Sequence, residues 1–137
     1  MAIVEQLIRS EENGAISFGN HKLEEKFKLD NFENSGDLYK VKTYKSMTKL
    51  EKNGMFLYES VPGTSVNDFF ETASGVSFLT EGDADAQITV GLKDDTEYEV
   101  FVAESPAGKM RTNLGGKLSV SLELAGMGEV AVKIEEV

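Results

Sequence analysis

The first residue with a distinctive chemistry is His21, the only histidine in the chain. A serine nucleophile needs a histidine beside it as general base and a carboxylate that orients the ring. His21 follows Gly19-Asn20 in a sequence that is typical of a turn. We therefore expect an exposed histidine without a catalytic role.

Acidic side chains are the second candidates for chemistry, because the chain has 24 Asp and Glu residues. Glycoside hydrolysis uses two carboxyl groups held about 5–10 Å apart in a cleft, and no pair in the sequence is singled out for this role. The acidic turns at residues 83–85 and 94–95 match no calcium-binding loop. Cysteine is absent, which excludes disulfides, thiolate zinc sites and a cysteine nucleophile. We expect solvated acidic turns, no metal site, no cofactor and no enzyme activity.

Aromatic and lysine side chains gather between residues 38 and 58. An aromatic face with cationic neighbours can bind sugar rings or a partner protein. The alternative is that the aromatic side chains form a core face while the lysines occupy the solvent face and the sheet edges. If a surface of this protein carries function, we expect it here. The candidate binding residues are Tyr39, Lys40, Lys42, Tyr44, Phe56 and Tyr58.

The elements that must position these residues are strands, because apolar and polar residues alternate along most of the chain. Tyr98, Val100 and Val102 share one side of an extended segment, as period two requires. Turn signals such as Asn13-Gly14 and Asn53-Gly54 separate the segments and are typical of hairpins. The first ten residues fit a strand better than a helix, and residues 105–108 should interrupt the strands. We expect an all-β, antiparallel, sandwich-like fold, either one body or two small packed β units.

Residues 92–100 resemble the tyrosine corner of fibronectin-type-III and related immunoglobulin-like sandwiches. Leu92, Thr96, Tyr98 and Val100 match that pattern, and Asp94 stands where it usually has proline. The resemblance implies that the Tyr98 hydroxyl caps a turn that leads into a central strand.

A change in charge accompanies the best candidate boundary, at residues 61–64. Residues 1–62 carry nine Lys and Arg against ten Asp and Glu, whereas residues 63–137 carry five against fourteen. We expect an N-terminal antiparallel β unit over residues 1–61 and a C-terminal immunoglobulin-like β-sandwich unit over 62–137. A strongly negative half repels phosphate backbones and anionic membranes, so neither nucleic acid nor a membrane is an expected partner.

Most of the chain also resembles a family of small bacterial proteins, largely uncharacterised, that sometimes carry the label endosialidase. The resemblance is carried by residues 16–20, 37–43, 48–63, 108–110 and 112–118. Sialidases hold the substrate carboxylate with an arginine cluster and fold as propellers with repeated tryptophan-bearing turns. This chain has only Arg9 and Arg111 and no tryptophan, so we expect no sialidase activity.

The sequence thus predicts a non-catalytic binding or assembly module. The leading hypothesis is interaction with a protein partner or with further copies of the chain. The alternatives are a carbohydrate-binding module and, with least support, a small glycan-active hydrolase. The start of the chain lacks a basic segment followed by a long apolar segment, so we expect no signal peptide and a cytoplasmic location.

Overall fold

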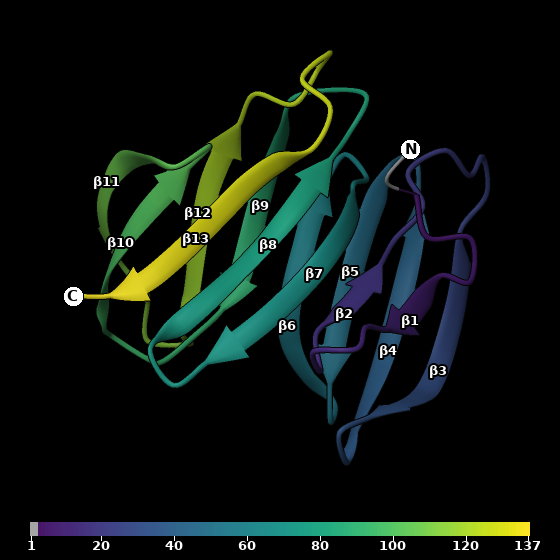
Figure 1. The fold of residues 1–137 in the computed structure, drawn as a ribbon, viewed down its shortest axis with the longest axis horizontal. Helices are drawn as coiled ribbons and strands as arrows, with labels where there is room; N and C mark the ends of the chain where they lie inside the picture. Colours follow the sequence, from purple (N-terminus) through teal and green to yellow (C-terminus); the bar gives the residue numbers. More distant parts are fainter. Residues whose placement is uncertain (1–2) are drawn as a thin grey trace.

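The computed structural model describes residues 3–137 and consists of strands joined by turns (Figure 1). Two antiparallel sheets pack face to face, and the apolar side chains between them form one continuous core. The predicted all-β, antiparallel sandwich is therefore confirmed. No helix that could span a membrane occurs in residues 3–137.

The first sheet has seven strands, and every neighbouring pair in it is antiparallel. Its edges are the three-residue strand β1 and the strand β11. In spatial order the strands are β1 (Ile8–Ser10), β2 (Ile16–Phe18), β7 (Ser65–Thr72), β8 (Gly75–Glu81), β13 (Val130–Glu136), β10 (Glu97–Val102) and β11 (Ser105–Arg111).

The second sheet has six strands and lies behind the first in the view of Figure 1. Its edges are β12 and β3, at opposite ends of the sheet. In spatial order the strands are β12 (Lys117–Leu122), β9 (Ala86–Gly91), β6 (Met55–Val61), β5 (Met47–Lys52), β4 (Asp37–Tyr44) and β3 (Phe27–Asn34).

Alternation along the strands decides which side chains enter the core. In β12, Leu118, Val120 and Leu122 are buried while the residues between them are exposed. The same alternation in β4 buries Tyr39, Val41 and Thr43. One face of each strand is therefore removed from water, and this burial is the main favourable term in folding.

Turn residues place the hairpins where the sequence predicts them. Asn53 and Gly54 both have positive φ, 52° and 79°, and connect β5 to β6. Ser35 and Gly36 do the same between β3 and β4, with φ of 54° and 85°. Two consecutive left-handed residues give the backbone twist that matches the strands of a tight hairpin.

One expectation about local structure was wrong, and another was confirmed only in part. Residues 105–108 do not interrupt the strands but begin β11, an edge strand in which Pro106 is tolerated because one side needs no ladder hydrogen bond. The turn lies earlier, at Ala103 and Glu104, which both have positive φ. Within the first ten residues only Ile8–Ser10 forms a strand, and the part of this prediction on residues 1–2 lies outside the described residues.

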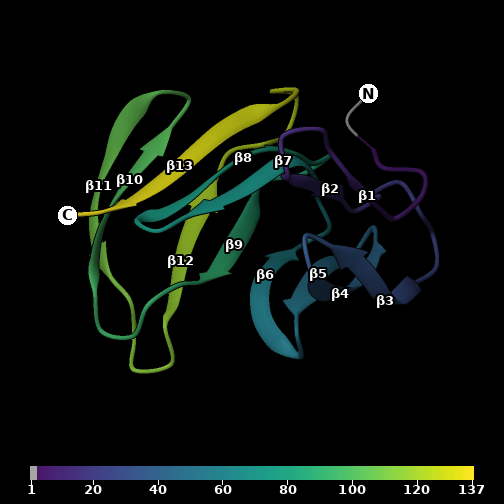
Figure 2. The same cartoon turned by 60° about the horizontal axis from the view of Figure 1, so that its bottom comes forward.

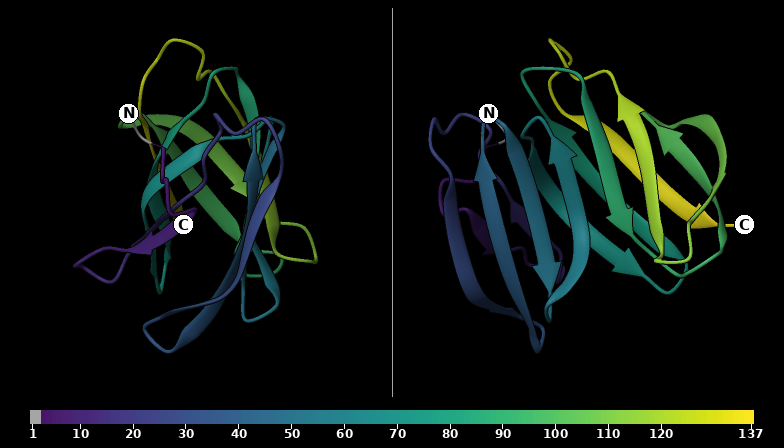
Figure 3. Two further views of the ribbon diagram at one scale, coloured as in Figure 1. Left: turned by 90° about the vertical axis from the view of Figure 1, so that its right-hand side faces the viewer. Right: turned by 180° about the vertical axis from the view of Figure 1, so that it is seen from behind.

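Both sheets continue across the boundary expected at residue 61. β6 pairs with β9 in one sheet, and β2 pairs with β7 in the other. Strands of the first 61 residues gather at one end of the sandwich and the later strands at the other, as Figures 2 and 3 show. The division into two units stays a prediction. Hydrogen-bonded strands and a common core connect the two parts.

Tyr98 makes the contact that the tyrosine-corner resemblance implies. Its ring is buried, and its hydroxyl accepts a hydrogen bond from the backbone N–H of Lys93 at 3.2 Å. This bond holds the turn between β9 and β10 against the start of β10, which pairs with both β11 and β13.

Candidate functional site

The six predicted binding residues lie in one sheet but on different sides of it. Tyr39 and Tyr58 point into the core, and Tyr58 has no exposed surface. Burial raises the pKa of Tyr58 to about 12, so its hydroxyl stays neutral. Because a ligand cannot reach these two rings, they act as core residues in this conformation.

Lys40, Lys42 and Tyr44 occupy the opposite, outer face of β4, and each is half-buried. The cross-strand register places Lys42 directly opposite Lys28 on β3 and directly opposite Lys49 on β5. Lys28, Lys42 and Lys49 thus form a line across three neighbouring strands, which we call the lysine row. Adjacent strands are about 4.8 Å apart, so the three side chains stand close together.

The neighbouring line of outer-face residues is charge-paired. Lys40 stands opposite Glu51 in the register, and its ammonium lies 3.9 Å from the carboxylate of Asp30. In the lysine row, by contrast, Lys28 and Lys42 form no ion pair among the described residues, and Lys49 lies 3.6 Å from Glu51. Like charges directly opposite one another destabilise a sheet. Lys49 also stands directly opposite Glu59 of β6, so the β5 end of the lysine row faces two carboxylates. The positive charge that the described residues leave without an ion pair is therefore that of Lys28 and Lys42.

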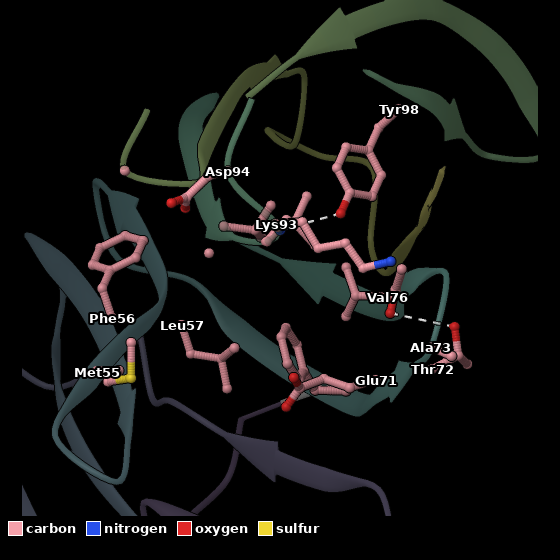
Figure 4. Close-up of a pocket in the computed structure, with 16 residues that line it drawn as sticks. Met55, Phe56, Leu57, Glu71, Thr72, Ala73, Val76, Lys93, Asp94 and Tyr98 are labelled. Atoms are coloured by element: carbon pink, nitrogen blue, oxygen red, sulfur yellow. Dashed lines mark hydrogen bonds between the residues drawn. The ribbon is translucent and has the colours of Figure 1, made fainter. Parts of the chain in front are cut away.

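A cleft of about 480 Å³ opens between the two sheets where β6 begins and β9 ends (Figure 4). The ladder between these strands stops at the pair Tyr58–Val90, so β6 diverges from β9 beyond that point. The floor of the cleft consists of apolar side chains from both sheets. They are Leu57, Phe69, Val76 and Val90, and Phe56, the last of the six predicted binding residues, also lines the cleft.

Charged side chains line the rim of this cleft, and most are already paired. Glu71 accepts from Lys52 at 3.2 Å, and Lys93 donates to Glu136 at 2.7 Å. Within residues 3–137 Asp94 forms no ion pair, and the guanidinium of Arg111 lies 3.4 Å from the neighbouring Asp95 instead. The cleft was not predicted from the sequence. Its lining comes from separated segments of the chain, and no local sequence pattern indicates that these segments lie close together.

His21 is buried, with 3% of its surface exposed, so the expectation of an exposed histidine was wrong. Its Nδ1 lies 2.7 Å from Ser65 Oγ, and its Nε2 lies 3.6 Å from the carboxylate of Asp83. A carboxylate near Nε2 favours a proton there, which leaves Nδ1 to accept from the Ser65 hydroxyl. Serine, histidine and aspartate therefore meet, but with the two ring nitrogens exchanged relative to a catalytic triad, in which Nε2 accepts from the serine and Nδ1 donates to the aspartate. Among the described residues Nε2 of His21 has no hydrogen-bond partner.

Burial of the serine limits what this arrangement can do. Ser65 is fully buried at the start of β7, and its hydroxyl also accepts from the backbone N–H of His21 at 3.3 Å. A nucleophile must reach a substrate carbonyl, and in this conformation water and substrate are both kept from Ser65 Oγ. The contacts of His21 with Ser65 and Asp83 instead connect the turn after β2 with β7 and with the turn after β8.

Acid should destabilise the protein through His21. Burial lowers the pKa of His21 below its ordinary value of 6.5, against the opposing effect of the Asp83 carboxylate. Below pH 6.5 the unfolded chain therefore binds a proton that the folded protein does not, and the free energy of unfolding falls until the folded pKa is reached. Urea unfolding between pH 7.5 and 5.5, followed by circular dichroism, measures this.

The variant His21→Asn serves as the control, since an amide can hydrogen-bond Ser65 but does not titrate. It should lose the part of the pH dependence just below pH 6.5 and keep the carboxylate-driven loss at lower pH. An identical pH dependence in both proteins would contradict the assignment to His21.

The acidic turns that the sequence singled out serve local structure. Asp85 accepts hydrogen bonds from the backbone N–H groups of Leu124 and Ala125, at 3.0 and 3.1 Å. Asp95 lies 3.4 Å from the guanidinium of Arg111. In the part of the chain that the structure describes, no three His, Asp or Glu side chains are grouped to hold a metal ion.

Comparison with known proteins gives no match to a family model, to a curated protein sequence or to a solved structure.

Proposed function

We propose that this protein is a non-catalytic binding module that holds an acidic protein partner on the outer face of β3, β4 and β5. The observation that carries the proposal is the lysine row, in which Lys28, Lys42 and Lys49 stand opposite one another. Carboxylates of a partner would compensate these charges. The absence of catalysis is part of the proposal, and the burial of Ser65 supports it.

The charge distribution of the whole chain would orient such a partner. The formal net charge is −10, and the excess of acidic residues lies in residues 63–137. An acidic partner is repelled from that half and attracted by the lysine row. Complementary potentials of this kind set the docking orientation and the association rate more than the affinity.

Tyr44 adds apolar contact area beside the lysines. Its ring is half-buried on the same outer face, and the ammonium of Lys26 lies 5.8 Å from the ring centre. An aromatic ring next to cations supplies contact surface as well as charge, and tyrosine is enriched at protein interfaces. Lys40, Lys42 and Tyr44 are thus the predicted binding residues that share the proposed surface.

Removing charge from the lysine row should weaken binding of a fluorescein-labelled oligoglutamate peptide, measured by fluorescence anisotropy at low salt. We expect the double variant Lys42→Gln/Lys49→Gln to bind about tenfold more weakly, because each exposed charge pair contributes up to about 1 kcal/mol. Added salt should weaken binding to the wild type through screening.

The matched control is Lys109→Gln/Lys133→Gln, which removes the same charge from the other half of the chain. Binding by this variant should stay within about twofold of the wild type, since only long-range attraction changes. An equal loss in both variants, or no binding by the wild type, would refute the proposal.

Carbohydrate binding in the cleft is the second candidate. The cleft is lined by Phe56, whose ring has the ammonium of Lys117 over it at 4.5 Å, and by the carboxylate of Asp94. Sugars are bound by aromatic rings together with polar groups. Binding of this kind would respond to Asp94→Asn and would be indifferent to Lys42→Gln/Lys49→Gln.

A further inference from the structure

β3 is an edge strand whose outer side has no neighbour. It pairs with β4 and forms the end of the six-stranded sheet, at the right of the molecule in Figure 1. The backbone N–H and C=O groups along that side are therefore free to pair with another chain. At eight residues β3 is longer than β1, β11 or β12, the other edge strands of the two sheets.

The inner face of β3 is apolar but uncovered. Phe27 and Leu29 stand opposite Thr43 and Val41, which are buried, so all four side chains point to the same side of the sheet. Yet Phe27 is 50% exposed and Leu29 is 37% exposed. Two large apolar side chains thus remain in water on the face of the sheet that elsewhere forms the core.

The other sheet is too short here to cover them. Its edge strand β1 has three residues, and it contacts β3 at the far end, where Ser10 donates to Asn34 at 2.7 Å. At the opposite edge of the sandwich, the inner-face residues Leu118 and Val120 of β12 are buried. An unpaired edge together with an uncovered apolar face is thus a property of β3 and not of β12.

We propose that β3 pairs antiparallel with β3 of a second copy of this chain, about a two-fold axis at Leu29. In this register Leu29 meets Leu29 of the partner subunit, and Lys28 stands opposite Asp30 of the partner subunit. The symmetry repeats each contact, so two oppositely charged pairs flank the central leucine pair. A two-fold interface requires such a self-complementary surface.

Charge selects this register. Lys28 and Asp30 lie on the outer face, since Lys28 stands opposite Lys42 and Asp30 lies 3.9 Å from Lys40. A register moved by two residues would place Lys28 against Lys28, or Asp30 against Asp30, of the partner subunit on the two-fold axis. One moved by a single residue would turn the apolar side chains to the opposite face. Pairing about Leu29 satisfies the charges and keeps Phe27 and Leu29 on the inner face.

The length of the pairing is limited by a bulge. The register between β3 and β4 shifts between Leu29 and Phe32, and Asn31 has a φ of 59°. Because a bulge bends and twists its strand, the new ladder extends over residues 27–31 only. The interface between the two copies is small. The dimer is therefore weak, and the fraction of dimer depends on protein concentration.

Pairing has a consequence for the lysine row. The two six-stranded sheets become one continuous sheet, and the lysine rows of both copies lie on the same outer face. Because Lys28 of each copy is paired with Asp30 of the partner subunit, a partner with repeated acidic segments would meet the rest of both rows at once, which raises its avidity without a new kind of contact. The pairing itself goes beyond the proposed function, because it requires no binding of an acidic partner.

A charge-swap series tests the register by sedimentation equilibrium of the full chain over a range of concentrations. Lys28→Asp places Asp against Asp30 of the partner subunit at both symmetric positions, and Asp30→Lys places Lys against Lys28. Each variant should dimerise about tenfold or more weakly than the wild type, because attraction becomes repulsion twice. The combination Lys28→Asp/Asp30→Lys restores opposite charges and should restore the dimer.

Lys117→Asp on β12 is the matched control at the other edge, and its dimerisation should equal that of the wild type. Thermal melts followed by circular dichroism verify that each variant is folded. Leu29→Glu puts a charge at the centre of the proposed interface and should weaken dimerisation as well. A wild type that is monomeric at every concentration would overturn the proposal, and would show that Lys28 and the bulge block this edge. Failure of the charge-swap combination to restore dimers would overturn it as well.

Discussion

Replacing Tyr58 by alanine should lower the free energy of unfolding by about 3–5 kcal/mol, the range for a large buried aromatic residue. The Tyr58 ring lies at the centre of the core, in edge-to-face contact with Phe18, Phe69 and Phe78 at centroid distances of 5.2, 6.1 and 5.7 Å. The substitution removes these contacts and leaves a cavity between the two sheets.

The hydroxyl of Tyr58 adds a polar contribution to this loss. It lies 2.7 Å from Thr64 Oγ1, which itself donates to Ser60, so the tyrosine is the donor to Thr64. Removing the whole side chain leaves the buried Thr64 hydroxyl oxygen without this donor, which lowers the free energy of unfolding further. Urea unfolding followed by fluorescence or circular dichroism measures the total.

Tyr44→Ala is the matched control, because the same substitution is made on the outer face of β4, in the same sheet. Its ring is half-buried, and its removal leaves no internal cavity. We expect a change of about 0.5 kcal/mol, as for most surface substitutions. Equal losses for both variants would contradict the assignment of Tyr58 to the core and Tyr44 to the surface.

Gly63→Ala should also destabilise the fold, by about 1–3 kcal/mol. A Cβ at this position would overlap the backbone carbonyl oxygen of Tyr44, and the backbone N–H of Gly63 donates to the carbonyl of Lys45 at 3.0 Å. The chain after Pro62 is thus packed directly on the turn between β4 and β5. The added methyl group can be accommodated only if one of the two backbones moves.

Gly115→Ala provides the control for Gly63→Ala. The nearest atom to a Cβ at Gly115 is the side-chain oxygen of Asn113, at the ordinary contact distance of 3.4 Å. Its effect on the midpoint of urea unfolding should be small. If Gly63→Ala were equally mild, residues 61–64 would have the freedom of a linker between separate units, contrary to the packing described above.

Much of the fold could be predicted from the sequence, because the relevant signals are local. Alternation in segments such as Leu118 to Leu122 indicates a strand with one apolar face. Asn53-Gly54 indicates a hairpin because these residue types readily adopt positive φ. The tyrosine-corner pattern likewise predicted the hydrogen bond of Tyr98 within its own turn.

The orientation of the candidate binding residues was only partly predictable. Tyr39 and Tyr44 are five positions apart on one strand, so period two places them on opposite faces, a signal that the sequence contained. Tyr58 was different, because the bulge that makes Leu57 an extra residue opposite β5 turns both Leu57 and Tyr58 inward. No local pattern reports a bulge of this kind.

Contacts between distant segments could not be predicted. His21 meets Ser65 and Asp83, which lie 44 and more residues further along the chain, and its own neighbours indicate only a turn. The cleft and the exposure of β3 depend in the same way on which strands face each other. Strand pairing of this range is decided by the whole topology and not by local propensity.

Titration of the ¹⁵N-labelled protein with an oligoglutamate peptide, followed by chemical-shift mapping, tests the central claim most directly. We expect salt-sensitive shifts confined to the outer face of β3, β4 and β5, strongest at Lys28, Lys42 and Lys49. Shifts centred on the cleft around Asp94, shifts spread evenly over the surface, or no shifts at low salt would contradict it.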